Sequence, residues 1–182
     1  MRVITGKYKG RTLTAPRENT RPTLDRMKET LFNIISGRLD GATVLDLFAG
    51  SGQLAIEALS RGAQRVVLCD NSRLAAAAIR ENFAKIGEKA ELYVCDYKAC
   101  LPALKGKFDI IFVDPPYKSG YYTDVLKSVA SLGILSDGGI VICEHLAEDN
   151  LPADVCGLSV ADSRKIGTVK FEFYKRSCEI CE

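Results

Sequence analysis

The sequence predicts an α/β fold built on a mostly parallel β-sheet, and two observations support this. First, an apolar segment at 43–47 runs into the turn Ala49-Gly50-Ser51-Gly52, after which a helical pattern continues to Gly62. Strand, glycine turn and helix form the entry to nucleotide-binding α/β units. Second, strand and helix patterns alternate from residue 42 onward. Strands such as 110–113 are apolar at every position, which indicates burial on both faces of a parallel sheet.

The N-terminal residues 1–36 are expected to form a small basic extension to this domain. Residues 2–15 have the pattern of a β-hairpin with a glycine-bounded turn. A helix is predicted from about 24 to 36, because apolar residues recur there at helical spacing and Thr23 is a suitable N-cap. The apolar face of this helix must pack on the main domain, residues 37–182, which would hold the extension beside the glycine turn.

The main domain is predicted to contain five successive strands, four helices and a final strand pair. The strands are expected at 43–47, 65–70, 91–95, 108–113 and 139–143, and the helices at 52–61, 72–86, 97–104 and 121–132. Two late strands, near 155–161 and 168–175, are separated by residues 164–167. They are expected to form an antiparallel hairpin at the edge of the sheet.

Composition favours a cytoplasmic protein without a membrane segment. Apolar residues make up 47% of the 182 residues, enough for a large core. No apolar run approaches the ~20 residues of a membrane span, and no signal peptide is visible. The seven cysteines have neither disulfide-scaffold nor zinc-site spacing, so we expect reduced thiols and no metal. Cys69, Cys95 and Cys143 are expected to act as small apolar residues, and we assign no role to the pair Cys178 and Cys181.

The positive charge is concentrated at the N-terminus. Residues 1–28 hold eight Lys and Arg against two acidic residues, a net charge of +6, so the remaining chain carries −4 of the total of +2. Such an asymmetry favours a polyanionic partner over a uniformly charged surface. Tyr8 lies among Lys7, Lys9 and Arg11, a combination of aromatic and cationic groups that suits RNA.

Acidic residues follow three successive predicted strands, at the edge where parallel sheets bind ligands. Asp70 would accept hydrogen bonds from a ribose diol, Asp96 from the exocyclic amine of adenine, and Asp46 would face a cationic amino group. Each could alternatively be a helix N-cap. Ala55 stands where a dinucleotide fingerprint needs a third glycine after Gly50 and Gly52, which disfavours NAD. Together these features predict S-adenosylmethionine as the cofactor.

The fourth strand ends in Asp114-Pro115-Pro116-Tyr117. Proline cannot continue a sheet ladder and has no N–H, so this exit is rigid and rich in hydrogen-bond acceptors. Acceptors facing an aromatic amine would orient its lone pair toward an electrophilic methyl group, and Asp114 could take the released proton. Tyr117 would stack on an extruded base. We therefore expect these four residues to form the catalytic corner.

These motifs resemble a known family. Residues 46–52 followed by the tetrad at 114–117 resemble S-adenosylmethionine-dependent enzymes that methylate amines. Residues 6–11, the segment 21–33 and the pair Glu144-His145 resemble, more narrowly, the bacterial enzymes that methylate N2 of a guanine in small-subunit (16S) ribosomal RNA. The resemblance extends from residue 1 to about 176.

The resemblance implies a seven-stranded Rossmann-like class I methyltransferase fold and an RNA substrate inside an assembling small subunit. A monomer is expected. The cofactor would contact Asp46, Phe48, Gly50, Gly52, Asp70, Asn71, Asp96 and Tyr97, and the RNA would contact Lys7, Tyr8, Lys9, Arg11, Arg21, Thr23 and Arg26. His145, the only histidine, is expected to have a structural role at a strand end.

Two alternatives remain open from the residues themselves. The tetrad suits amines in general, so the acceptor could be adenine N6 in DNA or RNA, or the amide of a protein glutamine. The basic extension favours nucleic acid over protein. The other alternative is a catalytically silent RNA-binding factor for ribosome assembly, which the intact tetrad and the acidic strand ends disfavour.

Overall fold

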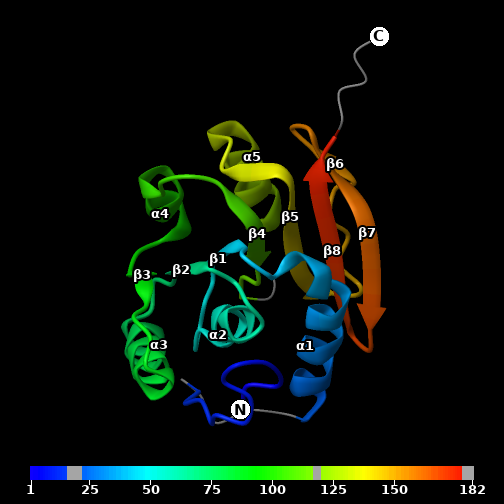
Figure 1. Ribbon diagram of the computed structural model, residues 1–182. Helices are drawn as coiled ribbons and strands as arrows, with labels where there is room; N and C mark the ends of the chain where they lie inside the picture. Colours follow the sequence, from blue (N-terminus) through cyan, green and yellow to red (C-terminus); the bar gives the residue numbers. More distant parts are fainter. Residues whose placement is uncertain (16–21, 117–119, 178–182) are drawn as a thin grey trace.

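The computed structural model describes residues 1–15, 22–116 and 120–177, with side chains from residue 26 onward in the second range. Its centre is one mixed sheet of eight strands in the order β3-β2-β1-β4-β5-β8-β7-β6 (Figure 1). The strands are β1 Thr43–Asp46, β2 Arg65–Cys69, β3 Glu91–Tyr93, β4 Phe108–Val113, β5 Leu135–Leu146, β6 Asp154–Val155, β7 Leu158–Ile166 and β8 Val169–Arg176. β1 to β5 pair in parallel, and β8, β7 and β6 follow in antiparallel pairs.

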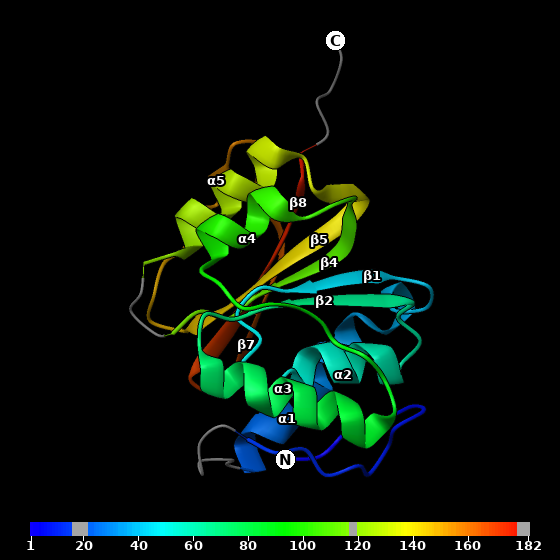
Figure 2. The ribbon, with the colours of Figure 1, turned by 90° about the vertical axis from the view of Figure 1, so that its left-hand side faces the viewer.

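Five α-helices cover the two faces of the sheet. They are α1 Pro22–Ile34, α2 Gln53–Ser60, α3 Arg73–Ile86, α4 Tyr97–Ala103 and α5 Tyr122–Leu132, and a short 3₁₀ turn spans Ser36–Arg38. Figure 2 shows α1, α2 and α3 below the parallel strands and α4 and α5 above them. Adjacent strand residues alternate between the two resulting cores, as when Val44 joins the first and Leu45 the second, which explains why these strands are apolar throughout.

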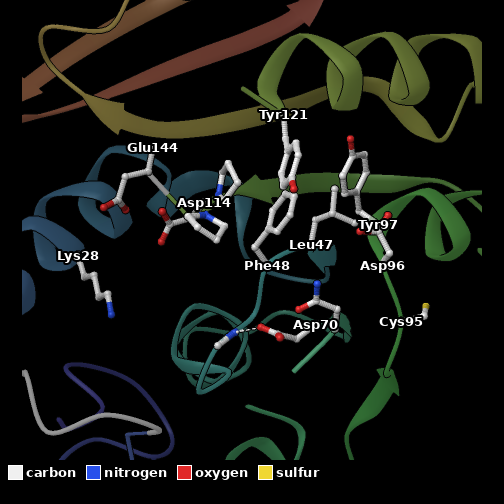
Figure 3. A pocket seen from close by; sticks show the side chains of 14 residues that line it. Lys28, Leu47, Phe48, Asp70, Cys95, Asp96, Tyr97, Asp114, Tyr121 and Glu144 are labelled. Carbon is white, nitrogen blue, oxygen red and sulfur yellow. Dashed lines mark hydrogen bonds between the residues drawn. The ribbon is translucent and has the colours of Figure 1, made fainter. Parts of the chain in front are cut away.

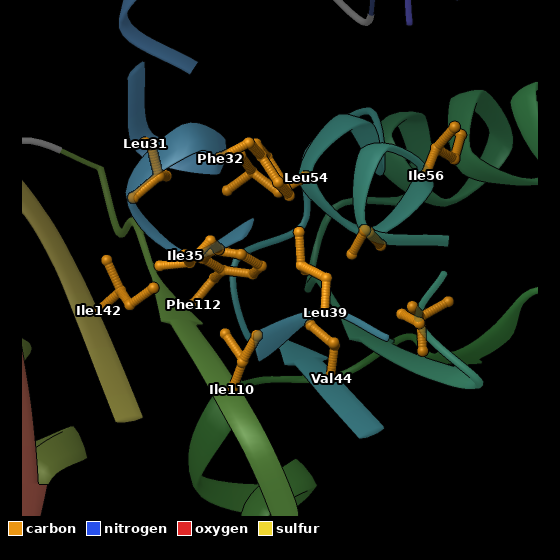
Figure 4. Close-up of a cluster of buried hydrophobic side chains, with 14 of the residues drawn as sticks. Leu31, Phe32, Ile35, Leu39, Val44, Leu54, Ile56, Ile110, Phe112 and Ile142 are labelled. Carbon is orange, nitrogen blue, oxygen red and sulfur yellow. The ribbon is translucent and has the colours of Figure 1, made fainter. Parts of the chain in front are cut away.

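Helix α1 docks on the sheet through a continuous apolar face. Leu31, Phe32 and Ile35 are at most 1% exposed and pack over the parallel strands (Figure 4). The rings of Phe32 and Phe112 lie 5.8 Å apart. Lys28 precedes Phe32 by four residues and therefore emerges on the same side of the helix. Burial of this face thus directs Lys28 toward the carboxyl ends of the strands.

The predicted fold class is confirmed, with corrections to the strands. The sheet has eight strands rather than seven, because the two-residue β6 pairs with the start of β7. β5 begins at Leu135 instead of 139, since Leu135 pairs with Phe108 before the register shifts. β7 continues to Ile166, and the turn to β8 is made at Gly167, whose φ is +64°. Glycine adopts a positive φ without strain, so the turn forms at Gly167, the last residue of the segment 164–167 that was predicted to separate the two strands.

The N-terminal hairpin is less regular than predicted, because its backbone bonds to helix α2 as well as to itself, where the N–H of Val3 donates to the carbonyl of Arg11 at 3.0 Å and that of Leu13 to Met1 at 2.9 Å. A single bridge joins Arg2 and Thr12. The N–H groups of Ile4 and Thr5 donate to the carboxylate of Glu57 in α2, at 2.7 and 3.1 Å. The division of the chain at residue 36 stays a prediction.

A close approach of Gly6 to α2 fixes the same segment. A Cβ on Gly6 would lie 1.7 Å from the carbonyl oxygen of Ser60, and φ at Gly6 is +87°. Val3 and Leu13 join the core beneath the sheet. The extension is therefore packed as part of the main body. None of the helices within the described ranges is long and apolar enough to cross a membrane.

Candidate functional site

A hollow of about 500 Å³ lies at the carboxyl ends of the parallel strands (Figure 3). A hollow thus lies at the edge of the sheet where the site was expected, and its role as the site stays a prediction. The predicted residues that line it are Phe48, Gly50, Asp70, Asn71, Asp96, Tyr97, Asp114, Pro115 and Pro116. The loops after β1, β2, β3 and β4 each contribute, so residues as distant in sequence as Phe48 and Pro116 meet because parallel strands end at one edge.

The glycine turn after β1 is tied to the end of β2 through Asp70. One oxygen of the Asp70 carboxylate accepts from the backbone N–H of Gly50, at 2.8 Å, and the other accepts from the N–H of Ser72, also at 2.8 Å. Ser72 is the N-cap of α3, so Asp70 is not itself the cap. Its carboxylate is fixed by two backbone donors while remaining on the wall of the hollow, where a diol could donate to it.

The next strand end carries Asp96 and a group of aromatic rings. Asp96 is the N-cap of α4, accepting from the N–H of Lys98 at 2.9 Å, so the capping alternative holds for this residue even though it lines the hollow. The ring of Phe48 lies 5.6 Å from that of Tyr97 and 6.3 Å from that of Tyr121, nearly parallel to the latter. These rings form an apolar wall against which a planar base could stack.

The opposite end of the hollow carries acidic side chains that are largely shielded from solvent. Asp114, at the end of β4, and Glu144, near the end of β5, both line it together with Lys28 of α1, whose ammonium donates to the side chain of Gln53 (Figure 3). Desolvation raises the pKa of Asp114 to about 6, opposed by the charge of Lys28. Desolvation, followed by the charge of Asp114, raises the pKa of Glu144 to about 8. Both carboxyls therefore titrate closer to neutral pH than exposed carboxyls do.

Asp46 and Gly52 lie behind the wall instead of on it. Asp46 is 2% exposed, its Oδ2 atom finds no hydrogen-bond partner among the described residues, and burial raises its pKa to about 7. Gly52 has a φ of +75°, and a Cβ there would approach the side chain of Leu68 to 3.2 Å. Backbone conformation and close packing therefore account for a glycine at this position. Contact of Asp46 and Gly52 with a cofactor stays a prediction.

Five lining residues were not predicted as site residues: Lys28, Leu47, Cys95, Tyr121 and Glu144. Lys28 reaches the hollow only through the docking of α1, and Tyr121 only because α5 begins beside the aromatic wall. Glu144 was predicted solely as part of a family motif. An acidic residue near the end of a fifth apolar strand is the same pattern that identified Asp70 and Asp96, so Glu144 could have been found.

The predicted RNA residues divide into three groups. Lys7, Lys9, Arg11 and Arg26 are exposed. Tyr8 was expected as a stacking surface, but it is 7% exposed and its hydroxyl donates to Glu88, so that expectation is wrong. The ring completes the core beneath the sheet. Arg21, Thr23 and Tyr117, together with Cys178 and Cys181, lie outside the described side chains.

His145 is buried within β5, away from the wall of the hollow. Its Nδ1 lies 2.8 Å from the carbonyl oxygen of Leu146, and its Nε2 lies 3.8 Å from the carboxylate of Glu172 on β8. Tyr122 packs its ring edge on the imidazole and donates its hydroxyl to the carbonyl of Glu144 at 2.6 Å. These contacts agree with the structural role expected for His145.

A parallel sheet with an antiparallel edge, helices on both faces and an acidic hollow at the strand ends define the class of Rossmann-like methyltransferases. Comparison with known proteins narrows this class. The chain belongs to the family described as Conserved hypothetical protein 95, whose model matches residues 1–175.

Relatives and solved structures agree with this assignment. "Ribosomal RNA small subunit methyltransferase D" of Escherichia coli is 33% identical over 98% of this chain and 91% of its own length. "Putative rRNA methyltransferase YlbH" of Bacillus subtilis is 37% identical over 97% of this chain and 99% of its own. The solved structure "Putative methyltransferase yhhF from Escherichia coli" superposes with a TM-score of 0.83 at 33% identity, covering 97% of this chain and 98% of that one. These matches confirm the family resemblance seen in the sequence.

Proposed function

We propose that the protein transfers a methyl group from S-adenosylmethionine to N2 of a guanine in small-subunit ribosomal RNA, in an assembling ribonucleoprotein particle. The observation that supports this most is that the two ends of one continuous hollow carry different chemical groups. Fixed carboxylates and aromatic rings that suit a nucleoside lie at one end, and the corner of Asp114, Pro115 and Glu144 lies at the other. Relatives named as ribosomal RNA methyltransferases over the full chain indicate the substrate class.

The nucleoside end fits the adenosine part of S-adenosylmethionine. Asp70 would accept from the ribose hydroxyls and Asp96 from the adenine amine, while Tyr97 and Phe48 pack beside the base. The unpartnered Oδ2 of Asp46, buried next to the glycine turn, supports a cationic group nearby. The cofactor supplies an electrophilic methyl on a sulfonium, and the protein supplies position.

The acidic end would hold the amine of the target base. Pro115 is buried and has no N–H, so its backbone can only accept a hydrogen bond. Asp114 would orient the amine and accept its proton, and the raised pKa of Glu144 makes it a second proton site. Lys28, by its charge, favours the ionised form of both carboxyls, but with a pKa of about 8 Glu144 stays mainly protonated at pH 7, whereas Asp114, with a pKa of about 6, is mainly ionised and can accept.

A basic groove on the N-terminal extension supports an RNA substrate. Arg2, Lys9 and Arg26, with one acidic residue, Glu29, line a hollow of about 620 Å³ between residues 2–10 and α1. α1 also carries Lys28 at the acidic end of the site. A phosphate backbone held in the groove would therefore lie along the helix that reaches the reacting corner.

The test is methyl transfer from tritiated S-adenosylmethionine to unmethylated small-subunit RNA and to small-subunit particles, followed by mass spectrometry of the nucleosides. We expect N2-methylguanosine at one position, and loss of transfer in Asp114→Asn with cofactor binding retained. Asp137→Asn is the matched control, because the Asp137 side chain is 90% exposed and lies outside the site.

Other products would decide among the alternatives. N6-methyladenosine would replace the guanine assignment by an adenine acceptor, and methylated glutamine in the particle proteins would replace RNA by protein. An inactive protein that binds particles but not S-adenosylmethionine would instead indicate an assembly factor.

A further inference from the structure

Three cysteine thiols meet beneath the nucleoside end of the hollow. Cys69 ends β2, Cys95 lies between β3 and α4, and Cys100 lies within α4. Their Sγ atoms all lie within 4.8 Å of one another, and all three are free thiols. Cys69 and Cys100 are buried, whereas Cys95 is half-buried and lines the hollow on the side of Asp96 (Figure 3). No metal was expected from the sequence, because these cysteines come together only through the fold.

The spacing of the three sulfurs suits a thiophilic ion. A Zn–S bond is about 2.3 Å long, so two thiolates on one ion lie about 3.8 Å apart in tetrahedral and about 4.0 Å apart in trigonal coordination. The observed upper limit of 4.8 Å exceeds these values by about 1 Å at most, which side-chain rotation can close. Three sulfurs are a ligand set that Zn²⁺ and similar soft cations prefer over Mg²⁺ or Ca²⁺.

We propose that Cys69, Cys95 and Cys100 bind one thiophilic divalent cation of the Zn²⁺ class, with solvent as the remaining ligand. All three cysteines belong to or pack against the apolar core, and the Cys69 thiol also donates to the carbonyl of Cys95 at 3.4 Å, but Cys95 in addition lines the hollow, where solvent or an ion can reach it. Cys143 is also buried on this face, but it lies on β5, three strands from β2 and so about 14 Å away. Cys156 is exposed elsewhere.

The ion would connect the two segments that carry the nucleoside-binding carboxylates. Cys69 immediately precedes Asp70, and Cys95 immediately precedes Asp96. Joining these backbones would fix the distance between the two carboxylates, and linkage then requires metal and cofactor to change each other's affinity by the same factor. This coupling rests on the proposed function, whereas the metal site itself does not.

The experiment begins with a variant that lacks the exposed Cys156 and the two cysteines of the C-terminal segment, Cys156→Ser with Cys178→Ser and Cys181→Ser. Anaerobic titration of the full chain with Cd²⁺, followed by thiolate-to-cadmium charge-transfer absorption, is expected to saturate at one equivalent. Zn²⁺ is expected to displace the Cd²⁺. Adding Cys95→Ser should weaken binding at least tenfold, whereas Cys143→Ala, the matched control, should leave it unchanged.

Folding is checked by circular dichroism. If Cys95→Ser does not fold, protection of Cys95 from alkylation by Cd²⁺ in the background variant replaces it. Absence of saturable binding in that variant, or binding that Cys95→Ser leaves intact, overturns the proposal. Oxidation of two of these thiols to a disulfide by peroxide, with no metal binding, also overturns it and indicates a redox pair.

The coupling is tested separately by calorimetry with S-adenosylmethionine, with and without Zn²⁺. A change in cofactor affinity supports it, and an equal affinity overturns the coupling alone. Asp70→Ala should weaken cofactor binding at least tenfold yet still take up one Cd²⁺, so failure of the proposed function and failure of the metal site are distinguishable.

Discussion

The Asp70 carboxylate lies 2.8 Å from the backbone nitrogen of Gly50, joining the carboxyl end of β2 to the turn that follows β1. This contact places the carboxylate while leaving it accessible in the hollow. We expect Asp70→Ala to weaken S-adenosylmethionine binding 10- to 100-fold, about 1.4–2.8 kcal/mol, because the ribose loses its acceptor and the turn loses its support. Calorimetry measures this, with the exposed Glu148→Gln as control. Unchanged affinity would place the ribose elsewhere.

Glu144 makes stability depend on pH. Its pKa is raised from 4.5 to about 8, so the folded chain binds more protons than the unfolded chain between these values. The associated stability is fully present below pH about 4.5 and is lost as pH rises through about 8. Glu144→Gln should raise the free energy of unfolding at pH 8.5 by up to about 5 kcal/mol and change it little at pH 4.5. Urea denaturation tests this, and an equal effect at both pH values would contradict it.

Lys28 opposes the raised pKa values of Asp114 and Glu144. Removing its charge in Lys28→Met should therefore raise both pKa values and move the pH at which methyl transfer begins to rise toward the alkaline side. The rate profile of the wild type is expected to rise between about pH 6 and pH 8, the values to which these pKa values are raised. The exposed Lys105→Met is the control. If Lys28→Met lowers the rate at every pH without shifting the profile along the pH axis, Lys28 acts in substrate binding and not through the pKa values of the carboxyls.

Gly6 and Gly10 form a matched pair for testing how the extension is held. Both have positive φ, +87° and +82°, but only at Gly6 would a Cβ meet the backbone of Ser60. Gly10→Ala should cost about 1 kcal/mol from backbone strain alone. Gly6→Ala should cost about 2–4 kcal/mol, because the extension must also move away from α2. Equal midpoints in urea for the two variants would show that the contact with Ser60 is not stabilising.

The order of elements was predictable because it depends on local pattern. Apolar strands ending in Asp46, Asp70 and Asp96 are recognisable from periodicity, and parallel pairing then places their ends at one edge. The burial of Tyr8 was not predictable in this way. Its neighbours are cationic, and only the packing of the extension against α3 shows that its hydroxyl reaches Glu88.

Residues that act through tertiary docking escaped prediction for a physical reason. Lys28 lies on a helix whose apolar face was correctly predicted to pack on the main domain, but periodicity does not indicate where along the sheet the helix lies. The convergence of Cys95 and Cys100 with Cys69 likewise depends on how α4 folds back over β2. Sequence spacing was therefore enough to locate the residues at the strand ends, whereas the residues that helices bring to the hollow could be found only from the structure.

The basic groove allows a prediction that separates specific contact from general charge. Arg2, Lys9 and Arg26 line it, whereas Lys165 is exposed on β7, outside both the groove and the site hollow. For each phosphate that a variant no longer neutralises, the slope of log affinity against log salt should fall by about 0.7 for single-stranded RNA. The triple variant Arg2→Glu, Lys9→Glu and Arg26→Glu should therefore flatten the slope by about 2. Lys165→Glu should leave it unchanged, and equal slopes for all variants would exclude the groove as the path of the RNA.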